Sequence, residues 1–151
     1  MKRFTAPELS IEIIPKQLAI NAFTGTSHSP EERARQTALE FCMAMEQDWF
    51  QISSWGDGES NVAGHFKDHL HYCLELYSAW LAARSNCIST MIAGPSNFPV
   101  SRAQKANKSE TKKFSAFNDG RAKSLKRIKK ELLPYGDGSV ILSNDPDAID
   151  K

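Results

Sequence analysis

Apolar residues recur every three or four positions along three long segments of the chain, which is the spacing of one face of an α-helix. The first segment begins at Ser29, an N-cap, with Pro30 at the first helical position and Glu32 completing a capping box. It ends at the "SSWGDGES" stretch of residues 53–60. The residues on its apolar face are Ala38, Phe41, Cys42, Met45, Trp49 and Ile52.

Two further helices are predicted by the same spacing. One runs from about Asn61 to about Ile92 and stops at Gly94-Pro95, and the next runs from near Ser101 to about Leu133, before "PYGDG". The apolar face of the last helix keeps its phase across Asn118-Asp119-Gly120, so we expect one helix there. Its apolar residues are Phe114, Phe117, Leu125, Ile128 and Leu132.

Two short segments alternate apolar and polar residues in the manner of β-strands. They are residues 9–14 and 139–143, and they are candidates for a two-stranded ribbon. We therefore expect a mainly α fold with three amphipathic helices packed as a small bundle. The whole chain, 1–151, would be one domain: an extended arm over 1–28, a core over 29–133, and a C-terminal segment over 134–151. That segment reads as a tail or as the start of a helix in a longer protein.

Composition narrows the class of protein. With 40% hydrophobic and 25% charged residues, the chain is of the globular type, and no apolar run approaches the roughly 20 residues that cross a bilayer. Three dispersed cysteines, Cys42, Cys73 and Cys87, fit a reducing compartment better than a disulfide framework. We expect a cytoplasmic protein without a cofactor.

The net charge of +1 hides a strongly uneven distribution of charge. Residues 1–100 carry seven Lys or Arg and eleven Asp or Glu, and residues 131–151 carry one Lys and five acidic residues. Residues 101–130 carry eleven basic residues and only two acidic ones. Such a basic block predicts a polyanionic partner.

The cations of the third helix gather on the side opposite its apolar face, over about 38 Å from the first to the last. They are Lys105, Lys108, Lys112, Lys123, Lys126, Arg127 and Lys130, interrupted by Asp119. Lysines suit phosphates better than base edges, so the stripe favours nucleic acid, with DNA ahead of RNA. A solubilising face and an acidic protein partner are the alternatives.

Arg84 lies within the apolar stripe of the second helix, where an unpaired charge is costly. Either it pairs internally with a carboxylate or with helix-end carbonyls, or the stripe opens there onto an anion. In the second case, Arg84 and Arg102 would anchor the start of a nucleic-acid site.

His65 and His69 are four residues apart, the spacing at which one helix face can chelate zinc. The glutamate of an H-E-x-x-H motif is absent, since Phe66 follows His65. Both histidines also flank the apolar stripe, which favours packed or interface side chains. We expect no metal site.

The stretch "GPSNFPVSRAQK", residues 94–105, resembles an uncharacterised domain of bacteriophage and mobile-element proteins, in which an arginine-bearing helix precedes this motif and a basic helix follows it. The resemblance covers about residues 78–151 and implies an accessory role in DNA handling or counter-defence. We expect a non-enzymatic nucleic-acid-binding protein. The alternative is a protein-interaction module that inhibits a host nuclease complex. The oligomeric state is left open.

Overall fold

The computed structural model describes residues 6–56, 58–87 and 100–133. These residues form four α-helices and one short 3₁₀ helix, η1, and contain no strand. The elements are η1 (Ile11–Ile13), α1 (Lys16–Thr24), α2 (Pro30–Trp55), α3 (Glu59–Arg84) and α5 (Val100–Leu132). The expectation of a mainly α-helical bundle is confirmed at this level.

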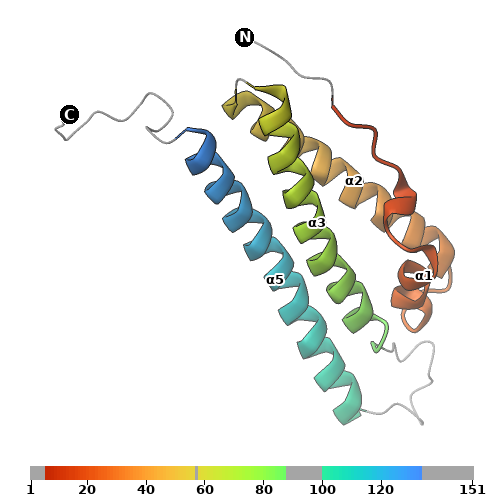
Figure 1. Ribbon diagram of the computed structural model, residues 1–151. Coiled ribbons are helices and arrows are strands. Elements are labelled where there is room, and N and C mark those ends of the chain that lie inside the picture. Colours follow the sequence, from red (N-terminus) through yellow and green to blue (C-terminus); the bar gives the residue numbers. More distant parts are fainter. Residues whose placement is uncertain (1–5, 57, 88–99, 134–151) are drawn as a thin grey trace.

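The most extensive contact between elements is that between α3 and α5, which lie side by side along most of their length (Figure 1). α1 packs against α2 and α3 at the end of the bundle where α2 begins and α3 ends (Figure 1). α2 contacts both α3 and α5. One side of α5 is therefore covered by the bundle, while its other side faces outward.

The N-terminal segment differs from the prediction. Residues 9–14 do not form a strand, because Ile11–Ile13 coil into η1 and Ser10 Oγ accepts a hydrogen bond from the Glu12 N–H at 3.1 Å. The second strand candidate, 139–143, lies outside the described residues. The predicted extended arm also contains a helix, α1, whose buried residues Ala19, Ala22 and Phe23 follow the helical spacing over too short a stretch to stand out.

The ends of α2 and α3 also differ from the prediction. Ser29 is the N-cap residue of α2, but its side chain makes no capping hydrogen bond, so the capping box is wrong; Pro30 does occupy the first turn. α3 begins at Glu59 and ends at Arg84, where the Ser85 N–H bonds the carbonyl of Leu81. The predicted continuation to Ile92 is therefore wrong up to residue 87, and residues 88–92 lie outside the described part.

The core is built around aromatic side chains from three helices. Tyr77 of α3 lies 4.8 Å from Phe41 of α2 and 4.9 Å from Phe117 of α5, measured between ring centroids. All three residues are buried. Trp49 is buried, as its place on the apolar face of its helix predicted, and Trp80 is buried as well.

α5 is one continuous helix across Gly120, as expected. A Cβ atom at Gly120 would lie 2.5 Å from Leu76 Cδ1 and 3.0 Å from the Tyr72 hydroxyl, so the glycine permits a close approach of α5 to α3. The buried face of α5 is centred on Phe117, Gly120, Ser124 and Ile128, with Ala103 also buried. Phe114, expected on this face, lies at its edge and is 40% exposed.

Candidate nucleic-acid interface

The outward side of α5 carries a row of exposed cations, which we call the cationic face. Its eight members are Arg102, Lys105, Lys108, Lys112, Lys123, Lys126, Arg127 and Lys130, and all of them are exposed. The 33 residues of α5 extend over about 50 Å. Every α5 cation that the sequence assigned to the site therefore lies on the accessible surface of one helix.

Few acidic groups compete for these cations on α5. Glu131 pairs with Arg127 at 2.7 Å, but the two side chains are 48% and 59% exposed, and surface pairs of this kind contribute about 0–1 kcal/mol. Glu110 turns inward, where its Oε2 accepts a hydrogen bond from Trp80 Nε1 at 2.6 Å. Asp119 remains as an exposed carboxylate within the row. The face therefore keeps a strongly positive potential.

Arg84 takes the internal alternative that its sequence position left open. Its Nη1 lies 3.8 Å from Glu110 Oε2, its Nη2 donates to Thr26 Oγ1 at 3.4 Å, and its guanidinium lies 4.8 Å from the centroid of the Phe23 ring. These contacts join α1, α3 and α5 at one end of the bundle. Arg84 is thus placed to hold helices together, whereas Arg102 lies on the exposed side of α5.

A buried ion pair fixes α5 against α2 at its middle. Arg121 Nε donates to Asp48 Oδ2 and Arg121 Nη2 donates to Asp48 Oδ1, both at 2.8 Å, and Nη2 also reaches the carbonyl of Ala44 at 3.2 Å. The Asp48 side chain is fully buried and that of Arg121 is 25% exposed. Arg121 is the one basic residue in the stretch 114–122. Its contacts with Asp48 and Ala44 direct it into the bundle, away from the cationic face.

His69 extends this pair into a network across three helices. Its Nε2 lies 2.8 Å from Asp48 Oδ2, and its Nδ1 lies 2.8 Å from Ser124 Oγ. A carboxylate only accepts hydrogen bonds, so Nε2 carries a proton and donates to Asp48. Cys73 Sγ lies 3.5 Å from Nε2, within the same buried cluster.

This network occupies both ring nitrogens of His69, which leaves neither nitrogen for a metal. His65 is half-buried and its side chain is not part of the network. Across the described ranges, no group of three or more His, Cys, Asp or Glu side chains is arranged to hold a metal ion. His69 is a packed core histidine, which is the interpretation that the apolar stripe favoured.

The hydrogen-bonded series Asp48–His69–Ser124 contains the three residue types of a serine-hydrolase triad. However, Ser124 is only 5% exposed, and Asp48 and His69 are not exposed at all. A nucleophile has to reach the bond that it attacks, and in this conformation Ser124 is enclosed by packed helices. The contacts describe a network that stabilises the fold.

The environment shifts the pKa values of the network in ways that follow from burial and charge. Burial alone would raise the pKa of Asp48, but the hydrogen bonds from His69 and Arg121 outweigh it and hold that pKa below its ordinary value. Burial, helped by the nearby Asp48 carboxylate, raises the pKa of the Cys73 thiol to about 12. Cys73 is therefore a neutral, unreactive thiol at physiological pH.

Sequence reasoning missed Asp48, Arg121 and Ser124 as partners. Each of the three nevertheless lies in phase with apolar residues. Asp48 is three residues after Met45 and four before Ile52, on an otherwise apolar helix face. Arg121 and Ser124 are spaced seven and four residues before Ile128, on the buried face of α5. Polar residues in phase with a core were the sign of a buried network, but their pairing depended on how three helices meet.

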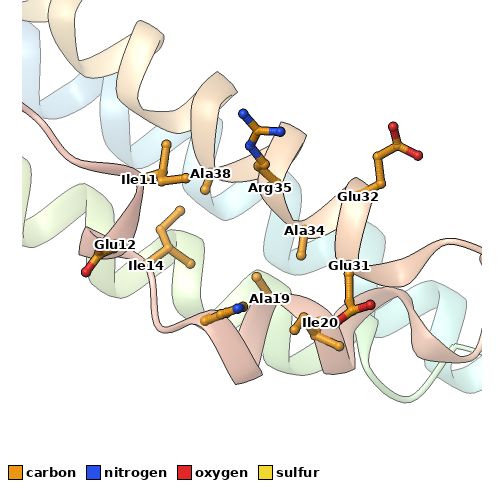
Figure 2. Close-up of a pocket in the computed structure, with 11 residues that line it drawn as sticks. Ile11, Glu12, Ile14, Ala19, Ile20, Glu31, Glu32, Ala34, Arg35 and Ala38 are labelled. Atoms are coloured by element: carbon orange, nitrogen blue, oxygen red, sulfur yellow. The ribbon is translucent and has the colours of Figure 1, made fainter.

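A second surface feature lies away from α5, between η1, α1 and α2. This hollow has a volume of about 820 Å³, and the apolar side chains that line it include Ile14, Ala19 and Ala38 (Figure 2). Its edge carries Glu31 and Glu32, together with Arg35 (Figure 2). With Glu12 and Lys16, which also line it, the hollow holds three acidic and two basic residues, so it lacks the excess of positive charge that the cationic face offers to phosphates.

Comparisons with protein-family models, with curated proteins and with solved structures find no match for this chain. None of the helices in the described part of the chain combines the length and the apolar character needed to span a membrane.

Proposed function

We propose that the chain binds nucleic acid through the cationic face of α5, as a non-enzymatic accessory protein. The observation that carries the proposal is the single exposed row of eight cations on a helix whose opposite side is packed against α3. Isolated surface lysines are common on soluble proteins, whereas this row follows one side of one rigid element. We further propose that this accessory role lies in DNA handling by a phage or mobile element.

Two further observations support phosphate contact as the mode of binding. The eight cations of the cationic face are exposed together on one side of α5, and counterion release rewards each of them that meets a phosphate. The inward turn of Glu110 toward Trp80 and Arg84 also removes a negative charge from the outward side. Lysine ammonium groups act as point charges, so we expect weak sequence preference.

The test is a salt titration of binding to a fluorescently labelled DNA duplex of about 25 base pairs, which is longer than the roughly 50 Å of α5. If six to eight phosphates are contacted, the logarithm of affinity should fall with the logarithm of salt concentration with a slope of about −5 to −7. Absence of binding at about 50 mM salt would overturn the proposal.

A pair of matched variants locates the surface. Reversing Lys112, Lys123 and Lys126 to Glu should reduce affinity by more than about a thousandfold, because six units of charge change on the contacting face. Reversing Lys16, Arg35 and Lys67, which are exposed on α1, α2 and α3, changes the net charge equally and should cost far less. Equal losses would show that binding follows net charge and not the cationic face.

An acidic protein surface, the alternative partner, is tested with polyglutamate as the probe in the same titration. Tighter binding of polyglutamate than of DNA at equal charge concentration would favour an acidic protein target over nucleic acid.

A further inference from the structure

The cations of α5 form two clusters, and the stretch between them lacks any outward cation. The amino cluster comprises Arg102, Lys105, Lys108 and Lys112, with the exposed Lys113 beside it, and the carboxyl cluster comprises Lys123, Lys126, Arg127 and Lys130. Between Lys113 and Lys123, the basic residue is Arg121, which is bound to Asp48 inside the bundle. The outward charge in this stretch is the carboxylate of Asp119.

The stretch between the clusters presents small side chains to solvent. Ser115, Ala116, Asp119 and Ala122 are exposed there, and none of them is bulky, whereas the exposed Phe114 packs against Trp80 at the edge of the stretch. The surface is shallowly hollowed over Ser115, Ala116 and Asp119, beside Lys108 and Lys112. The middle of α5 can therefore approach a partner more closely than its lysine-bearing ends.

The distance between the clusters matches one feature of a DNA duplex. Lys113 and Lys123, the exposed cations that border this stretch, are ten residues apart, which corresponds to about 15 Å along the helix axis. The major groove of B-form DNA is about 12 Å wide between the phosphate backbones that border it, and the minor groove is about 6 Å wide. The cation-free stretch is thus long enough to cover a major groove and longer than a minor groove requires.

We infer that α5 crosses the major groove of duplex DNA, with the amino cluster on one bordering backbone and the carboxyl cluster on the other. This inference rests on the proposed function and adds the form of the nucleic acid and the orientation of the helix on it. Asp119 then lies over the open groove, where it is further from the phosphates than it would be if α5 followed a single backbone.

The packing of α5 suits such a bridge because it keeps the separation of the clusters constant. The Arg121–Asp48 pair, the Ser124–His69 hydrogen bond and the close approach at Gly120 all act in the middle of the helix. A duplex is itself a stiff partner with regularly spaced phosphates, so a rigid spacing of cations loses little entropy on binding.

Single-stranded nucleic acid fits this face less well. Proteins that bind single strands combine cations with aromatic side chains on which bases stack. Within the described ranges, the exposed aromatic residues are Phe50, Tyr72 and Phe114, and Phe114 packs against Trp80 at 4.9 Å between ring centroids. The outward side of α5 between its clusters therefore lacks a stacking platform.

The deciding experiment uses Asp119→Lys, measured by the same salt titration on duplex DNA. If α5 crosses the groove, the added lysine has no phosphate within reach and the salt slope should stay at its wild-type value. If α5 follows one backbone, the lysine gains a phosphate contact and the slope should steepen by about 0.9. Helical circular dichroism of the variant serves as the folding control, since Asp119 is exposed.

Two cluster variants and two competitors complete the test. The triple variants K105Q/K108Q/K112Q and K123Q/K126Q/K130Q should each flatten the slope by about 2.7. An RNA duplex, whose major groove is deep and narrow, should bind on the order of tenfold more weakly than DNA, and so should a DNA single strand of equal length.

The outcomes separate this inference from the proposed function. Failure of the wild type to bind any of the three nucleic acids would overturn both. Binding with a steeper slope for Asp119→Lys, or with equal affinity for DNA and RNA duplexes, would overturn the groove crossing while leaving nucleic-acid binding in place. If only one of the two triple variants flattens the salt slope, α5 contacts phosphates through one cluster alone, and this result would also overturn the groove crossing.

Discussion

The replacement Arg121→Ala tests whether the buried network holds α5 on the bundle. It removes two charge-assisted hydrogen bonds to Asp48, each of 2.8 Å, and leaves that carboxylate in a site with no solvent exposure. The remaining side-chain donor to Asp48 is His69 Nε2. Removing one partner of a buried ion pair costs about 3–5 kcal/mol of the free energy of unfolding.

The structure sets an upper limit to this loss. If keeping the unpaired carboxylate charged costs more free energy than protonating it, Asp48 binds a proton and becomes neutral. Protonating a carboxyl group with an ordinary pKa of about 3.9 at pH 7 costs about 4 kcal/mol. Since His69 still donates one hydrogen bond and Arg121 is 25% exposed, we expect a loss of about 3 kcal/mol.

The assay is urea unfolding followed by tryptophan fluorescence, with Arg127→Ala as the matched control on the same helix. Arg127 pairs with Glu131 at a similar distance, 2.7 Å, but both side chains are about half exposed. Its removal should cost about 0–1 kcal/mol. With a denaturant slope of about 1–3 kcal/mol per molar urea, a loss of about 3 kcal/mol lowers the midpoint by about 1–3 M.

Equal losses for Arg121→Ala and Arg127→Ala would refute the reasoning, because burial would then have no effect on the strength of the pair. If Arg121→Ala does not fold, Arg121→Lys retains the charge without the two-pronged geometry. It should lose about 1–2 kcal/mol relative to the wild type, still more than Arg127→Ala.

Two further predictions concern the core. The pKa of Asp48 is lower in the folded than in the unfolded chain, so its contribution to stability is complete above about pH 4 and is lost as the pH falls through the folded-state value. The difference in free energy of unfolding between the wild type and Asp48→Asn should therefore become smaller as the pH is lowered from about 5 to about 3, one unit either side of the ordinary carboxyl pKa. A difference that stays constant over this range would contradict the lowered pKa of Asp48. Trp49 Nε1 is buried and has no hydrogen-bond partner among the described residues, whereas Trp80 Nε1 donates to Glu110. Trp80→Phe should therefore cost about 1–2 kcal/mol more than Trp49→Phe in urea unfolding. Equal costs would show that the indole hydrogen bond contributes nothing.

Helix periodicity predicted the long elements well, because each long helix must bury one continuous apolar face. α2 and α5 appear close to the expected bounds, and α5 remains one helix through Gly120. Short elements were harder to predict. α1 has only nine residues, and the Ile11–Ile13 segment alternates like a strand but is bent by local hydrogen bonds into η1.

In the candidate site, too, some features were predictable from the sequence and others were not. Exposure of the lysines on α5 was predictable, since their positions oppose the apolar face of an amphipathic helix. The partners of Arg84 were not predictable, because Glu110 comes from another helix, 26 residues further along the chain, and Thr26 lies in the turn after α1, 58 residues before Arg84. The partner of Arg121 was not predictable for the same reason, because Asp48 comes from another helix, 73 residues earlier in the chain.

The sequence by itself determined that this protein is helical, that its aromatic residues form a core and that one helix carries a row of cations. These properties depend on the order of residues within single helices, where periodicity alone sets which side each residue occupies. Only the tertiary structure decided which polar residues meet inside the bundle and leave the outward side of α5 divided into two clusters. Asp48, His69 and Ser124 come from three different helices, and their contact depends on how those helices pack.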